Sequence, residues 1–137
     1  ALPQRANATV NCRIMPGVDP LTIQATLVDI MNDPQIQVTP MREANPSPAS
    51  PLTEEVMAPI MQITEDLWPG TPVVPVMSTG ATDGLFFRKA GTPVYGVSGI
   101  FSDMDDVRAH GRDERIGIED FFKGLEFQER LVRAFAE

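Results

Sequence analysis

Apolar and polar residues alternate in two early segments of the chain. Residues 8–15 alternate as far as the turn at Pro16–Gly17, and residues 35–41 alternate in the same way. A period of two is typical of a strand with one buried face. Two short apolar runs, 73–77 and 92–97, have the composition of buried strands. The pattern therefore predicts four strands.

Apolar residues at helical spacing predict four helices. Asp19 and Pro20 form a helix-start signal, and the pattern that follows extends to Asn32. Ser50–Pro51 repeats that signal before a second helix, which we expect to end at Trp68–Pro69–Gly70 and which carries Pro59 inside it as a kink or delayed start. A short third helix is predicted over 85–90, with Gly91 closing it.

The last helix is predicted from about Ile118 to the end of the chain. Its apolar residues recur at helical spacing, so we expect them to face inward. The residues of this predicted buried face are Ile118, Phe121, Phe122, Leu125, Leu131 or Val132, and Phe135. The second helix has a comparable stripe at Val56, Ile60, Ile63 and Leu67.

The order of these elements predicts an α/β protein in two parts. Residues 1–45 read as β-α-β, which is half of a small split β-α-β sandwich. Pro46, Pro48 and Pro51 mark a linker. Residues 46–137 read as α-β-α-β-loop-α. The chain opens Ala1–Leu2–Pro3, and we expect it to be the interior of a longer protein or to complete its sheet by association.

Charge and composition narrow the function classes. A formal net charge of −8 repels phosphate backbones, so we expect no nucleic-acid partner. No run of about 18 apolar residues occurs, so we expect no membrane-spanning helix. The one cysteine, Cys12, is expected to be a buried apolar residue of the first strand.

A loop rich in glycine and hydroxyl groups, residues 78–84, follows the third predicted strand and precedes a helix. Free N–H groups at a helix start can hold an anion. The alternative is an ordinary turn in which Thr82 or Asp83 only caps the helix.

Residues 108–116 hold the only histidine of the chain, His110, and five of the nine are charged. The alternative is that His110 is a surface histidine with no functional role. Arg13 projects from the polar face of the first predicted strand. It is either a functional residue or simply a solvated residue of the sheet.

Three segments in fixed order, 11–13, 78–84 and 110–116, together resemble the C-terminal part of a known enzyme family. This is the zinc-dependent exopeptidase and deacylase family that includes glutamate carboxypeptidase, acetylornithine deacetylase, succinyl-diaminopimelate desuccinylase and aminoacylase. The resemblance covers essentially the whole chain, and His-Gly-x-Asp-Glu-Arg at 110–115 is its most specific motif.

The resemblance implies an α/β catalytic domain that holds two Zn²⁺ ions, with a smaller lid domain that mediates homodimerisation. Residues 1–45 would be the second half of the lid, and 46–137 the closing segment of the catalytic domain. The reaction it implies is hydrolysis of a small peptide or N-acyl amino acid next to a free carboxylate.

The resemblance also assigns site residues. His110 matches a zinc ligand, and Arg13 matches a lid arginine that binds the substrate carboxylate. A further set, which borders the substrate, consists of Gly80, Thr82 and Asp83. Glu114 is expected to support the loop.

The family's remaining metal ligands and its general base have no counterpart in these 137 residues. A catalytic zinc needs about three protein ligands. We therefore expect the chain alone to be inactive and to bind zinc weakly or not at all. The alternatives are a non-catalytic dimerisation or interaction module and an anion-binding domain built on residues 78–84. Substrate identity and cellular compartment stay open.

Overall fold

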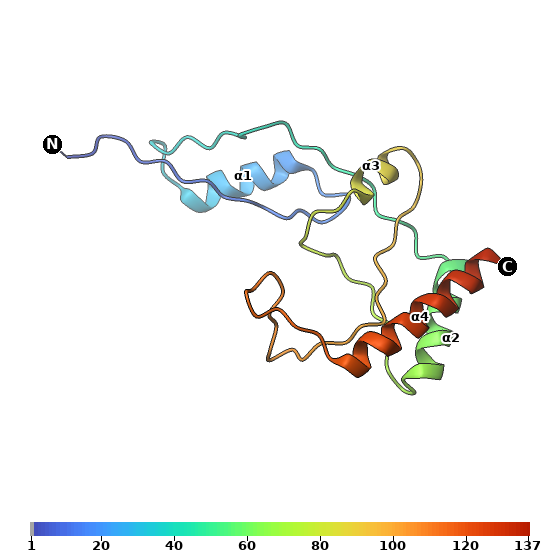
Figure 1. Ribbon diagram of the computed structural model, residues 1–137. Helices are drawn as coiled ribbons and strands as arrows, with labels where there is room; N and C mark the ends of the chain where they lie inside the picture. Colours follow the sequence, from blue (N-terminus) through green and yellow to red (C-terminus); the bar gives the residue numbers. More distant parts are fainter. Residues whose placement is uncertain (1) are drawn as a thin grey trace. The chain divides into compact units, whose positions relative to one another are not determined.

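The computed structural model describes residues 2–137 and forms four helices there (Figure 1). They are α1 (Pro20–Met31), α2 (Glu54–Leu67), α3 (Gly84–Lys89) and α4 (Ile118–Ala136). All four predicted helices are thus confirmed, with bounds close to those expected. None of the helices in the described part of the chain is long and apolar enough to cross a membrane.

The ends of α1 follow the predicted signals. The Asp19 carboxylate accepts a hydrogen bond from the Leu21 backbone N–H at 2.9 Å, and Pro20 occupies the first turn. Asn32 closes the helix in the left-handed region at φ 43°, and its N–H donates to the Val28 carbonyl.

The start of α2 differs from the prediction. The helix begins at Glu54 after Thr53, not at Ser50–Pro51. The Ser50 hydroxyl is engaged elsewhere, because it accepts from the Val94 N–H at 2.9 Å and donates to the Val94 carbonyl at 2.7 Å. It is therefore not free to cap a helix. Pro59 lies inside α2 without ending it, and the helix stops at Trp68 as predicted.

The four predicted strands do not pair in residues 2–137. Segments 8–15, 35–41, 73–77 and 92–97 run as chain without ladder partners. A strand is stable only beside neighbours that take its backbone groups, and these segments have none there. The α/β arrangement consequently stays a prediction, and Cys12 is exposed instead of buried.

The chain divides into two compact units. The first contains the residues up to Ser50 together with Met77–Val94, and the second contains Pro51–Val76 with Tyr95–Glu137. In the first unit, the Gln24 amide donates to the Val38 carbonyl at 3.1 Å and holds the segment after α1 against that helix. The predicted domain boundary at residue 45 concerns a larger assembly and stays a prediction.

The second unit has a small core where α2 and α4 pack side by side (Figure 1). Its buried apolar residues are Ile60, Ile63, Phe127 and Leu131. Trp68 adds its ring, 5.8 Å from Phe127 and 4.9 Å from Phe101 between centroids. The predicted stripe of α2 is confirmed, because Val56 and Leu67 also pack on this core.

The buried face of α4 differs from the predicted one, although Leu131 is buried as expected. Phe127 is 2% exposed, whereas Ile118 is 76% and Phe122 is 62% exposed. Both faces of α4 carry apolar residues, and helical spacing alone does not choose between them. Gly124 decides the choice, because the absence of a side chain there lets α4 approach Gly99 and Ile100 closely.

The total exposed surface of this chain is large, at 11731 Å². A compact protein of this mass exposes roughly 7000 Å², and two separate compact domains of half that mass roughly 8500 Å². The excess therefore does not depend on how the two units are placed, and many large apolar side chains are among the exposed residues.

Candidate functional site

The loop 78–84 is shaped by local hydrogen bonds. The Gly80 N–H donates to the Ser78 hydroxyl at 3.1 Å, and the Phe86 N–H donates to the Asp83 carbonyl at 3.0 Å as α3 begins. Asp83 stands at the N-cap of α3, yet its carboxylate makes no capping hydrogen bond. The side chains of Thr82 and Asp83 are exposed. The alternative that the Asp83 carboxylate caps α3 is therefore not what the structure shows.

Gly84 is the one buried residue of α3. A Cβ atom there would lie 2.9 Å from Arg88 Nη1, 3.1 Å from Thr82 Oγ1 and 3.1 Å from Val94 Cγ1. The loop exit is thus closely packed, and a side chain at position 84 would require Arg88, Thr82 and Val94 to shift. Since α3 has only six residues, it offers little helix dipole, and the anion-binding alternative gains no support.

The far end of α3 is fastened to the linker. Arg88 Nε donates to the Ser47 hydroxyl at 3.2 Å, and Lys89 donates to the Asn45 side-chain oxygen. Ser50 also makes two hydrogen bonds to the backbone of Val94. Together these contacts hold residues 45–50 against α3 and the segment that follows it. Arg13 is exposed in the same unit, and its guanidinium faces solvent.

His110 belongs to the second unit and lies at the tip of a tight loop. The Gly111 N–H donates to the Arg108 carbonyl at 2.9 Å, which closes a four-residue turn. His110 occupies the third position with φ 64°. Type II turns need a positive φ there and usually use glycine or asparagine. A histidine in this conformation costs about 1–3 kcal/mol, so the surroundings must hold it.

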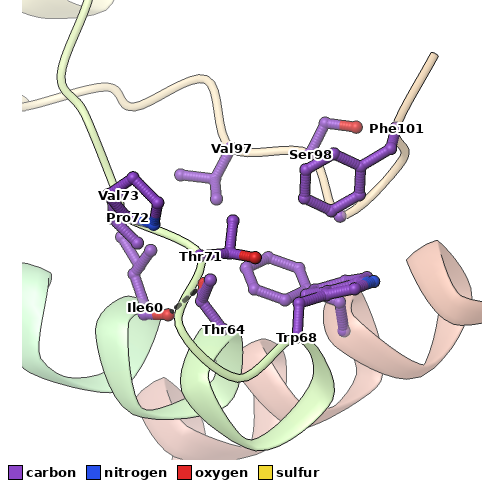
Figure 2. Close-up of a pocket in the computed structure, with 11 residues that line it drawn as sticks. Ile60, Thr64, Trp68, Thr71, Pro72, Val73, Val97, Ser98 and Phe101 are labelled. Carbon is purple, nitrogen blue, oxygen red and sulfur yellow. Dashed lines mark hydrogen bonds between the residues drawn. The ribbon is translucent and has the colours of Figure 1, made fainter. Parts of the chain in front are cut away.

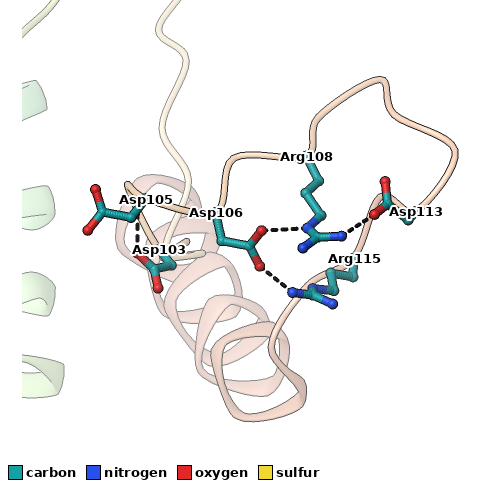
Figure 3. A network of polar contacts seen from close by, with 6 residues as sticks. All are labelled: Asp103, Asp105, Asp106, Arg108, Asp113 and Arg115. Atoms are coloured by element: carbon teal, nitrogen blue, oxygen red, sulfur yellow. Dashed lines mark hydrogen bonds and ion pairs between the residues drawn. The ribbon is translucent and has the colours of Figure 1, made fainter.

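Four charged side chains surround this turn (Figure 3). One oxygen of Asp106 accepts from Arg108 Nε at 2.5 Å, and the other accepts from Arg115. Arg108 also pairs with Asp113. The hydrogen bonds from Arg108 and then Arg115 hold the pKa of Asp106 below its ordinary value. We call these residues, Asp106, Arg108, Asp113 and Arg115, the ionic clasp.

The ionic clasp was not predicted as a functional feature. The sequence shows the density of charge around His110, but charge density does not say which residues pair. Glu114, which was expected to support the loop, is exposed and lies outside the clasp.

The described residues offer one ligand for a metal ion but do not form a complete metal site. No group of three His, Cys, Asp or Glu side chains in residues 2–137 is placed to hold a metal ion. His110 presents an exposed imidazole, which is a suitable zinc donor. The other donors of any catalytic zinc would have to come from elsewhere.

A hollow of about 160 Å³ lies over the α2–α4 core (Figure 2). Its lining includes the rings of Trp68 and Phe101, which meet edge to face, and Thr64, whose hydroxyl donates to the Ile60 carbonyl at 2.7 Å. No ionisable side chain lines it. It is a gap in an apolar layer and offers no acid, base or metal ligand for catalysis.

Comparison with characterised proteins gives relatives in one enzyme family. The chain is 31% identical over 137 residues to the N-fatty-acyl-amino acid synthase/hydrolase PM20D1 of Xenopus tropicalis, covering 96% of this chain and 26% of that protein. It is 28% identical over 136 residues to PM20D1 of Homo sapiens, covering 96% and 27%. It is also 28% identical over 138 residues to the probable carboxypeptidase S-like 1 of Dictyostelium discoideum, covering 98% and 28%.

The chain therefore spans about a quarter of the length of the curated relatives it matches. No solved structure matches it at a significant level. The model of the Peptidase family M20/M25/M40 matches residues 2–134, which is nearly all of the chain. The resemblance drawn from the three sequence segments is confirmed, and the chain belongs to the Peptidase family M20/M25/M40.

Proposed function

We propose that the chain is part of a di-zinc metallopeptidase or amidohydrolase that cleaves an amide bond next to a free carboxylate. The family match over residues 2–134 carries the proposal. Relatives are named for N-fatty-acyl-amino acids and for carboxypeptidase action. An N-acyl amino acid and a peptide C-terminus share one chemical feature, an amide nitrogen on the carbon that bears the carboxylate. That shared feature defines the substrate class.

The proposed roles follow the chemistry of each side chain. Arg13 binds the substrate carboxylate, because a planar guanidinium donates two parallel hydrogen bonds to it. Gly80, Thr82 and Asp83 border the same substrate, and the polar side chains of Thr82 and Asp83 are exposed there. His110 gives one nitrogen to a metal. When bound, two zinc ions supply a hydroxide and polarise the scissile carbonyl.

Completion of the fold belongs to the same proposal. Segments 8–15 and 35–41 would pair in a lid that forms a homodimer, and segments 73–77 and 92–97 would join the sheet of the catalytic domain. The many exposed large apolar side chains support this, because unpaired strands leave such side chains uncovered. The chain alone would then be inactive, since His110 is a single donor.

The test is an assay of the full-length protein against N-acyl amino acids of short and long acyl chain, and against dipeptides. Each substrate is compared with its carboxamide, which lacks the negative charge. We expect hydrolysis of the free acids, loss of activity with a chelator and recovery with Zn²⁺. Hydrolysis of acids and carboxamides at equal rates would contradict the proposed substrate class, and activity that survives metal removal would contradict the zinc chemistry.

A second candidate is an interaction module without chemistry. The same exposed apolar residues favour it, because large uncovered patches mark association surfaces. The reading frame before Ala1 discriminates between the two. His-x-Asp and Glu-Glu motifs encoded there would support the enzyme, and a start codon adjoining Ala1 would support the module.

A further inference from the structure

We infer that the ionic clasp is the device that positions His110: it holds the turn at 108–111 in shape before any metal binds. Asp106, Arg108 and Arg115 are thus assigned as positioning residues. The inference rests on the proposed function only where it concerns metal affinity. Its claim about the turn stands on the contacts around His110 alone.

The first argument is the geometry of closure. Asp106 and Arg115 are nine residues apart in sequence, and their ion pair closes the base of the loop. Arg108 and Asp113 form a second pair nearer the tip. Arg108 also forms an ion pair with Asp106, so the four side chains make one continuous network of ion pairs across the loop (Figure 3). His110 and Gly111 lie in sequence between the two sides of the loop that the network joins, residues 106–108 and 113–115.

The second argument is the backbone of His110. A positive φ of 64° is unfavourable for a histidine, and it persists only when neighbouring contacts determine the turn. The turn itself contributes one backbone hydrogen bond, from Gly111 to Arg108. Gly111 has no room for a side chain, because a Cβ atom would lie 3.0 Å from the Arg108 carbonyl oxygen. Arg108 therefore links the turn to the clasp through both its backbone and its side chain.

The third argument is that the clasp lies outside the buried core of the second unit. The loop contributes no residue to the buried core. All four clasp residues are at least a third exposed at their side chains, so they add little to general stability. We therefore attribute this ion-pair network to the positioning of the strained His110 in its loop.

The decisive variant is Asp106→Asn in the full-length protein. It removes the charge that both arginines share and keeps the size of the side chain. Asp105→Asn is the matched control, because it makes the same change one residue away and its carboxylate points out of the network (Figure 3). Arg115→Gln cuts only the ion pair at the base of the loop, and Arg112→Gln is its control, because Arg112 is not one of the clasp residues.

The first readout is hydrogen exchange of the backbone amides of residues 106–116 in metal-free protein. We expect at least tenfold faster exchange in Asp106→Asn and a smaller rise in Arg115→Gln, with no change in either control. Adding His110→Gly to Asp106→Asn should restore part of the protection, because glycine adopts the positive φ without strain. Equal exchange in Asp106→Asn and Asp105→Asn would overturn the inference.

The second readout is the affinity for Zn²⁺ by chelator competition, together with the absorption spectrum of the Co²⁺-substituted protein. Partners that orient a metal ligand typically change metal affinity 10- to 100-fold when they are removed. We expect a loss of this size and an altered spectrum in Asp106→Asn, and neither in Asp105→Asn. Faster exchange with unchanged affinity and spectrum would overturn the positioning of a metal ligand.

His110→Ala separates this inference from the proposed function. If His110→Ala leaves Zn²⁺ affinity unchanged, the ligand role given to His110 is wrong. The exchange comparison between Asp106→Asn and Asp105→Asn then still decides, by itself, whether the clasp holds the turn.

Discussion

Gly99 lies under the most buried side chain of the chain, Phe127. A Cβ atom on Gly99 would lie 2.5 Å from Phe127 Cβ, and that atom cannot move away without shifting α4. Gly96 is three residues earlier in the same segment and has no neighbour within 4 Å of its own Cβ position. The two glycines therefore differ in packing while sharing the same backbone segment.

We expect Gly99→Ala to lower the free energy of unfolding of the full-length protein by about 1–3 kcal/mol, the usual cost of overpacking. Gly96→Ala should change it by less than about 0.5 kcal/mol. Urea denaturation of both variants checks this. Equal stabilities would mean that α4 does not approach Gly99 as described.

Arg13 is exposed and makes no side-chain hydrogen bond or ion pair within residues 2–137, and its proposed role is to bind the substrate carboxylate. Loss of a hydrogen bond to a charged group costs about 1.5–3 kcal/mol, which is roughly 10- to 150-fold in kcat/KM. Arg13→Ala should lose this much with free-acid substrates, chiefly through KM, and little with carboxamides. Arg5→Ala, with the same charge change in the same exposed segment, is the control. An unchanged ratio of acid to carboxamide rates in Arg13→Ala would refute the role.

At the scale of elements, helices were predictable and strand pairing was not. Helix ends depend on local signals such as Asp19 and Gly91, which act within a few residues. Strand segments need partners, and in residues 2–137 no ladder forms. The inward face of α4 was missed because Phe122 and Phe127 are both apolar, and the small residue Gly124 decides between them. The three site motifs were visible in the sequence, but the pairing within the clasp depends on three-dimensional distances.

The helices α2 and α4 are joined by one ion pair, Asp66 with Arg130. The hydrogen bond from Gln62 and then the one from Arg130 hold the pKa of Asp66 below its ordinary value of 3.8. Both stabilise the charged carboxylate, which therefore favours the folded state.

A depressed folded-state pKa gives stability that is present above pH 3.8 and is lost as the pH falls through the lower, folded value. We expect wild type to be more stable than Asp66→Asn at neutral pH, and the gap to narrow steadily below pH 4. Thermal melts of both proteins between pH 3 and pH 7 measure this gap. A gap that is constant across the range would show that ionisation of Asp66 does not contribute.

At the scale of the whole molecule, many large apolar side chains are exposed. They include Phe86, Phe87, Phe122 and Val76. The proposed catalytic domain would cover them.

We expect the isolated 137-residue chain to bind the fluorescent dye anilinonaphthalene sulfonate strongly and to unfold over a broad temperature range. The full-length protein should bind little dye and unfold sharply, because the apolar faces are covered there. Fluorescence titration and calorimetry compare the two. Weak dye binding and a sharp transition in the isolated chain would contradict the coverage by further chain.

The two hydrogen bonds between the Ser50 hydroxyl and the Val94 backbone limit how a neighbouring strand can pair with this segment. Both backbone groups of Val94 point to one side, as in a strand, and one hydroxyl occupies both of them. On the opposite side, Pro93 has no N–H to offer, and Tyr95 is the next residue that can both donate and accept. Ser50 therefore acts as an end stop at Val94: on that side of the segment a neighbouring strand could pair only from Gly96 onward, and on the opposite side full pairing would begin at Tyr95.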